Sequence, residues 1–131
     1  TKLQPYFLTR CLLWLGALFF LSEAFLHFFG LPILEHDRIF LFTHDRYIAL
    51  FALTYAFLLT LTATDPKKYR LLGFATFVGI LLGMLNAAWI ASQGGYEVLF
   101  PTLTLDSDLS ILGFWFGLWV LSAILAFSTK K

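Results

Sequence analysis

The chain has 131 residues, of which 60% are hydrophobic, 19% are aromatic and 13% are charged, and its mean hydropathy is +0.82. A soluble domain carries about twice this share of charged residues, and so short a chain has too little interior to hide sixteen Phe and four Trp. These values exclude a soluble globular protein, a nucleic-acid-binding protein and a disordered chain. We therefore expect an integral membrane protein, and the net charge of +1 points to no particular partner.

Four segments are apolar and long enough to cross a bilayer as helices, which takes about 20 residues. In chain order they cover about 6–30, 47–64, 69–92 and 109–127. All four prolines lie outside these segments. Gly30 followed by Pro32 is typical of a helix stop, because glycine adopts the left-handed cap and proline cannot continue the helix. The sequence thus predicts a single domain over 1–131, an all-α four-helix bundle in the membrane.

The connections between the segments carry their own signals. The second connection, 65–68, reads Asp-Pro-Lys-Lys and predicts a tight turn between antiparallel helices. His-Asp-Arg occurs at 36–38 and again at 44–46, each time before an apolar run, which predicts a short interfacial segment at 39–42 and then the second helix. The expected helix caps are Thr43 or Asp45 for the second helix, and Asp106, Ser107 or Asp108 for the fourth.

Basic residues flanking the segments predict the orientation of the bundle. They lie before or at the start of the first segment, around the 65–68 turn and at the end of the chain (Lys2, Arg10, Lys67, Lys68, Arg70, Lys130 and Lys131). The connection 93–108 contains acidic residues but no Lys or Arg. We therefore expect a multi-pass protein with both termini in the cytoplasm, located in the inner (plasma) membrane of a bacterium.

Small residues recur every four positions along the third segment, at Ala75, Gly79, Gly83, Ala87 and Ala91. A similar series in the second segment is Ala52, Ala56, Thr60 and Thr64, and the fourth segment contains Gly113 and Gly117. Such stripes let helix backbones approach closely, which matters because lipid provides no hydrophobic drive between helices. We expect Gly79, Gly83, Ala87, Gly113 and Gly117 to close the bundle, with docking of another subunit as the alternative.

Glu23 and His27 are four residues apart, so they share one face of the first helix. Titratable residues at this depth are costly and turn towards a partner or a wet cavity. At about 1.5 Å per residue, Asn86 and the start of the second segment reach the same level. We therefore expect a polar cluster near the extracytoplasmic side, with these members: Glu23, His27, Asn86, His36, His44 and Asp45.

This cluster has three interpretations. The first is a hydrogen-bond network that fixes the register of the helices. The second is a pocket for a metal, haem, quinone or lipid head group, since imidazole and carboxylate groups suit Zn, Fe, Mn or Cu(II); the metal ligands would come from Glu23, His27, His36 and His44. The third is a proton or ion path. The spacing matches no established metal motif, and the sequence requires no cofactor.

No arrangement of residues along the chain identifies a catalytic group, so we expect a protein that is not an enzyme. The leading hypothesis is a structural or accessory subunit, or a self-associating scaffold, whose partners are the bilayer and other membrane subunits or a second copy. The alternatives are a small ligand-handling membrane protein, which would include an enzyme, and an ion or proton conductor.

Overall fold

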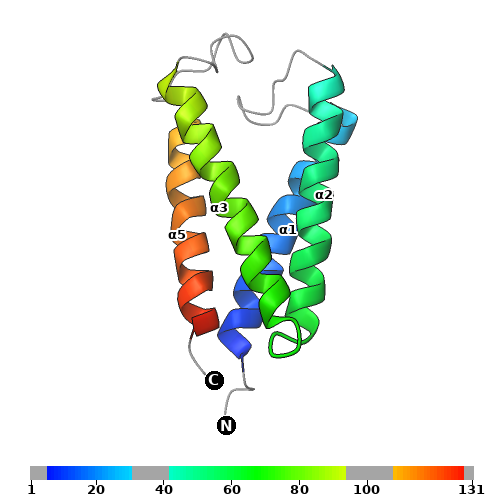
Figure 1. The fold of residues 1–131 in the computed structure, drawn as a ribbon. Helices are drawn as coiled ribbons and strands as arrows, with labels where there is room; N and C mark the ends of the chain where they lie inside the picture. Colours follow the sequence, from blue (N-terminus) through cyan, green and yellow to red (C-terminus); the bar gives the residue numbers. More distant parts are fainter. Residues whose placement is uncertain (1–5, 31–41, 94–107, 129–131) are drawn as a thin grey trace.

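The computed structural model describes residues 6–30, 42–93 and 108–128, and within them the chain forms four α-helices and no strands (Figure 1). The helices are α1 (Phe7–Phe29), α2 (Phe42–Thr64), α3 (Arg70–Ser92) and α5 (Asp108–Ser128). The start of α1, the turn between α2 and α3 and the end of α5 lie together at one end of the bundle, which we call the turn end (Figure 1). The all-α fold with four helices is confirmed.

The first helix ends where the sequence predicts. Gly30 has φ 64° and ψ 39°, the left-handed conformation that glycine adopts without strain, and its backbone N–H donates to the carbonyl of His27 at 3.4 Å. Tyr6, which precedes the helix, also has a positive φ of 63°. This start carries no side-chain cap. The stop at Gly30 is therefore the better-defined end of α1.

The second helix begins at Phe42, rather than near residue 47 as expected. The polar residues 43–46 look like part of a connection in the sequence, but Asp45 lies within the first turn of α2, where the positive end of the helix dipole favours a carboxylate. Thr43 is likewise inside the helix. The fourth helix begins at Asp108, whereas residues 31–41, Asp106 and Ser107 lie outside the described residues.

The turn between α2 and α3 has the predicted position. The backbone N–H of Lys68 donates to a carboxylate oxygen of Asp65 at 3.1 Å, and the N–H of Tyr69 donates to the Asp65 carbonyl at 3.0 Å. Pro66 is fully buried, with less than 2% of its surface exposed. Asp65 thus fixes the chain reversal from both its backbone and its side chain.

Small buried residues form the packed faces of α1 and α2. Those of α2 are Ala49, Ala52, Ala56 and Ala63, and they surround the fully buried Leu59. Their spacing of three and four follows the helical period of 3.6, whereas a strict spacing of four drifts around the helix. For this reason Thr60 is only half-buried and Thr64 is exposed.

A tryptophan fixes α5 against α1. A Cβ atom at Gly16 would lie 2.1 Å from the ring of Trp119, so the two helices approach closely only because position 16 has no side chain. The indole Nε1–H of Trp119 donates to the carbonyl of Leu12 at 2.8 Å. Phe77 and Phe116 place their rings against the same indole. This contact joins α1, α3 and α5 in one core.

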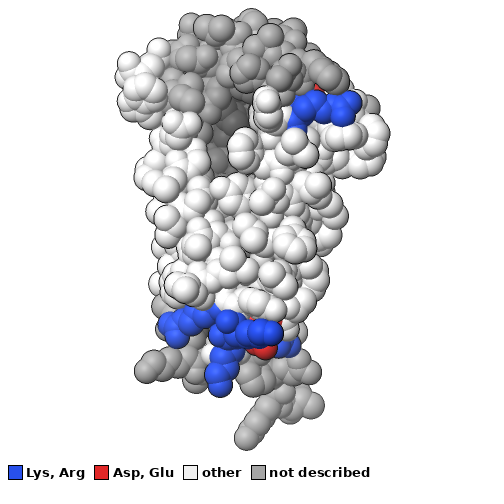
Figure 2. Space-filling model, turned by 45° about the vertical axis from the view of Figure 1, so that its right-hand side comes forward, with Lys and Arg blue, Asp and Glu red and all other residues white. Residues whose placement is uncertain are grey.

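The surface of the helices is apolar. Large side chains are exposed on all four, among them Phe25, Phe51, Leu82 and Trp115. Figure 2 shows a middle band without Lys, Arg, Asp or Glu on the face it presents, between charged groups at both ends. Two helices are long and apolar enough to cross a membrane, namely α1 and the 45–64 part of α2. The apolar stretches found in α3 and α5, 70–86 and 113–126, are shorter, so four crossings stay a prediction.

Candidate functional site

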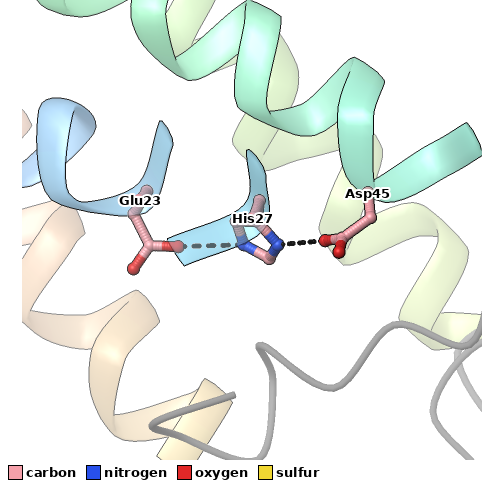
Figure 3. Close-up of polar contacts among 3 residues, drawn as sticks. All are labelled: Glu23, His27 and Asp45. Carbon is pink, nitrogen blue, oxygen red and sulfur yellow. Dashed lines mark hydrogen bonds and ion pairs between the residues drawn. The ribbon is translucent and has the colours of Figure 1, made fainter. Parts of the chain in front are cut away.

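Glu23, His27 and Asp45 meet at the end of the bundle opposite the turn end, and we call them the triad (Figure 3). A carboxylate oxygen of Asp45 lies 2.7 Å from Nδ1 of His27, and one of Glu23 lies 3.1 Å from Nε2. His27 is buried, with 4% of its surface exposed, and Asp45 is also buried. The imidazole ring therefore stands between two carboxylates, one from its own helix and one from α2.

Local structure explains how the triad assembles. One helical turn separates Glu23 from His27, so both project from the same face of α1. The left-handed Gly30 ends α1 shortly afterwards, and α2 returns antiparallel with Asp45 in its first turn. Ala24 and Ala49 are buried between the two helices and line the same groove, which lets the backbones come close enough for the hydrogen bond.

The arrangement determines where protons must be. A neutral imidazole has one N–H donor, whereas an imidazolium has two. Because each ring nitrogen of His27 faces a carboxylate oxygen, both contacts are hydrogen bonds only if His27 is protonated or one carboxyl group carries the second proton. Hydrogen bonds to ionised groups are roughly twice as strong as neutral ones. The triad is thus a charge-assisted link between α1 and α2.

The same geometry does not suit a metal ion. Glu23 and Asp45 contact different nitrogens of the ring, so their carboxylates lie on opposite sides of His27 (Figure 3). Among the residues that the structure describes, no group of three or more His, Cys, Asp or Glu side chains is placed to hold a metal. His36, and the side chain of His44, lie outside these residues.

Arg46 is a neighbour of the triad and is not among the residues expected in the polar cluster. Its guanidinium carbon lies 4.0 Å from the centroid of the Phe28 ring, a cation–π distance. Phe28 follows His27 directly and Arg46 follows Asp45, so this contact also joins α1 to α2. In the sequence, only the adjacent Asp45 and Arg46 pointed to this contact, and nothing identified Phe28 on α1 as the partner of Arg46.

Asn86 does not join the triad and is exposed on α3. Figure 1 shows the reason: α2 and α3 diverge from their turn, so residues at the same height on the two helices are far apart. An equal rise along two helices brings residues together only where the helix axes stay parallel, and α3 leans away from α2 towards this end.

The glycines expected to close the bundle have different surroundings. A Cβ at Gly79 would lie 3.0 Å from the hydroxyl of Tyr55, and one at Gly117 would lie 3.7 Å from Met84. In the part of the chain that the structure describes, a Cβ at Gly83 or Gly113 would have no heavy atom within 4 Å beyond the backbone of its own helix. The side chain of Ala87 lies outside the described part of α3.

Gly16 makes a closer contact than any of these four glycines, and the sequence does not predict it. Its partner, Trp119, lies far away in the sequence and comes into contact only when α5 packs on α1. A lone glycine in an apolar run carries no signal of such a partner.

Comparison with known proteins gives no family for this chain. No protein-family model, no curated protein and no solved structure matches it. The function is therefore inferred from the triad, the surface and the packing of the helices.

Proposed function

We propose that the protein is an integral membrane protein whose four helices all cross the bilayer, and that it is a structural or accessory subunit, or a self-associating scaffold, of a membrane assembly. The observation that carries this proposal is the exposed apolar surface of all four helices. In water such a surface would aggregate, whereas in lipid it is the expected exterior. Both termini would lie in the cytoplasm, beside the inner membrane of a bacterium.

The lengths of α3 and α5 support the proposal that these two helices also cross the membrane, although their apolar stretches are short. These helices have 23 and 21 residues, and at about 1.5 Å per residue each extends roughly 30 Å, the thickness of the hydrocarbon layer. After Arg70 and Asp108, at their first positions, neither helix contains a Lys, Arg, Asp or Glu. A helix of this kind satisfies its own backbone polar groups in lipid.

The open positions on α3 and α5 support an assembly role. Within the described residues, a Cβ at Gly83 or Gly113 would meet no atom of another helix within 4 Å, and Leu82 and Asn86 near Gly83 are exposed. In a membrane, small residues are where the helix of another subunit or a second copy approaches most closely. Both ring nitrogens of His27 are used within the triad, which supports a structural role for this group.

Gly83→Leu tests the assembly role, with Ala88→Leu on an exposed part of α3 as the matched control. We expect Gly83→Leu to abolish co-purification of the partner subunit or second copy from cross-linked native membranes. The melting temperature of the variant in detergent should stay unchanged, because a Cβ at position 83 meets no atom of another helix in the described part of the chain. Ala88→Leu should retain the assembly. An assembly that survives Gly83→Leu would contradict the role.

A second candidate, proton handling, is favoured by the continuous hydrogen-bond chain from Glu23 through His27 to Asp45. Proton relays in membranes are built from such groups. The Glu23→Gln variant separates the candidates in liposomes loaded with a pH-sensitive dye. A relay should lose proton flux, whereas a scaffold should show no flux in either protein and should keep its assembly.

A further inference from the structure

Basic residues gather at the turn end. The described residues there include four basic side chains (Arg10, Lys67, Lys68 and Arg70) and one acidic side chain, Asp65. Figure 2 shows Lys and Arg atoms as a band across one end of the molecule. At the opposite end, the described side chains include one basic residue, Arg46, and two acidic residues, Glu23 and Asp45. Among the side chains that the structure describes, basic residues therefore predominate at the turn end and acidic residues at the other.

The turn between α2 and α3 is ordered by its own contacts and leaves its basic side chains exposed. The carboxylate of Asp65 accepts the backbone N–H of Lys68, and Pro66 is fully buried. Lys67, Lys68 and Arg70 are exposed. The Nζ atom of Lys68 lies 5.1 Å from the centroid of the Tyr69 ring, which keeps this cation close to the protein surface.

Arg10 adds a buried donor to this surface. It lies on α1 next to Thr9, whose hydroxyl donates to the carbonyl of Ala126 on α5 at 3.2 Å. The Nε atom of Arg10 is buried and has no hydrogen-bond partner within the described part of the chain. A buried donor without an acceptor is costly. Arg10 as a whole is only half-buried, so an anion at this end would meet other N–H groups of its guanidinium rather than the buried Nε.

We propose that the basic surface formed by Arg10, Lys67, Lys68 and Arg70 binds the phosphate head groups of anionic phospholipids in the leaflet beside the turn end. This inference rests on the proposed membrane location. Anionic lipids attract basic residues next to a membrane-spanning helix, and guanidinium groups bind phosphate oxygens with two parallel hydrogen bonds. The surface includes a residue of α1 and residues of the turn before α3, so a bound lipid would bridge α1 and the start of α3.

Native mass spectrometry of the full-length protein in detergent tests this surface, with short-chain phosphatidylglycerol, phosphatidylcholine and inorganic phosphate as probes. We expect phosphatidylglycerol to bind at least about tenfold more tightly than phosphatidylcholine. Since each basic residue contributes about fivefold to such binding, the triple variant Lys67→Gln/Lys68→Gln/Arg70→Gln should weaken phosphatidylglycerol binding on the order of a hundredfold. Arg10→Gln should weaken it by about fivefold or more.

Arg46→Gln is the matched control, because it removes one cation from the opposite end, and it should keep the lipid preference. Equal binding of the two lipids, or an unchanged preference in the triple variant, would overturn the proposal. Inorganic phosphate that binds as tightly as phosphatidylglycerol would overturn it too, by indicating a site for free anions. Alkaline extraction tests the membrane location separately. If the protein is not integral to the membrane, this treatment releases it, whatever lipid it prefers.

Discussion

At the residue scale, burial and hydrogen bonding have opposite effects on the stability of a charged His27 side chain. Burial of an ionised group is unfavourable unless partners replace the lost water. Glu23 and Asp45 supply these partners at both ring nitrogens. Removing the ring leaves the partly buried Glu23 and the buried Asp45 without their imidazole partner, so the stability of this end of the bundle depends on one side chain.

His27→Leu should therefore lower the free energy of unfolding in detergent by about 3 kcal/mol, the usual effect of breaking a buried ion pair. Equilibrium unfolding by circular dichroism measures this change. Ser22→Ala is the control on the same helix, because the Ser22 hydroxyl is exposed and donates to the Leu18 carbonyl of its own turn. Its effect should stay within about 0.5 kcal/mol. Equal stabilities for the two variants would contradict a structural role for the triad.

The contact between Gly16 and Trp119 leads to a second prediction. Gly16→Ala should destabilise the protein by about 1–3 kcal/mol, as overpacking does, because the indole is held by its hydrogen bond to Leu12 and cannot move freely. Gly113→Ala adds the same methyl group to α5, where no described atom beyond the helix's own backbone lies within 4 Å of it. It should be neutral or stabilising by up to about 1 kcal/mol, since alanine favours a helix. Thermal unfolding of the two variants in the same detergent checks this contrast.

At the element scale, the sequence predicts the ends of helices better than it predicts which residues of other helices they contact. The stop at Gly30 and the turn at Asp65 were predictable because glycine and proline act locally on the backbone. The start of α2 was not, because Asp45 looks like a cap in the sequence and its partner His27 lies on another helix. The exposure of Asn86 could not be predicted either, because the sequence does not show how far α3 diverges from α2.

The buried face of α2 allows a test of whether α1 and α2 pack through their small residues. Ala56 is buried and lines a groove together with Ala17 of α1, so Ala56→Leu should force the two helices apart. We expect a loss of about 1–3 kcal/mol in the free energy of unfolding, measured by chemical denaturation in detergent. Ala88→Leu, the same substitution on an exposed part of α3, should change stability by less than about 0.5 kcal/mol. An Ala56→Leu variant as stable as the unmodified protein would mean that these helices are not packed through their small residues.

At the scale of the whole molecule, composition already predicted an apolar exterior. Sixteen Phe in 131 residues could not all be buried, and the structure exposes several of them, including Phe25, Phe51 and Phe114. What composition could not predict is the difference between the two ends, with the triad at one and the basic surface at the other. That difference arises because the antiparallel helices bring charges from distant parts of the sequence to the same level.

The most direct test of the central proposal is the labelling of single cysteines by a membrane-impermeant maleimide in spheroplasts, after Cys11, the sole cysteine, is replaced by serine. Gln93→Cys lies just after α3, and Lys68→Cys lies in the turn before it; both positions are exposed. If all four helices cross the membrane, Gln93→Cys reacts in intact spheroplasts, whereas Lys68→Cys and Lys131→Cys react only after the membrane is opened. Labelling of Gln93→Cys and Lys68→Cys from the same side would contradict a membrane-spanning α3, and with it the four-helix membrane protein.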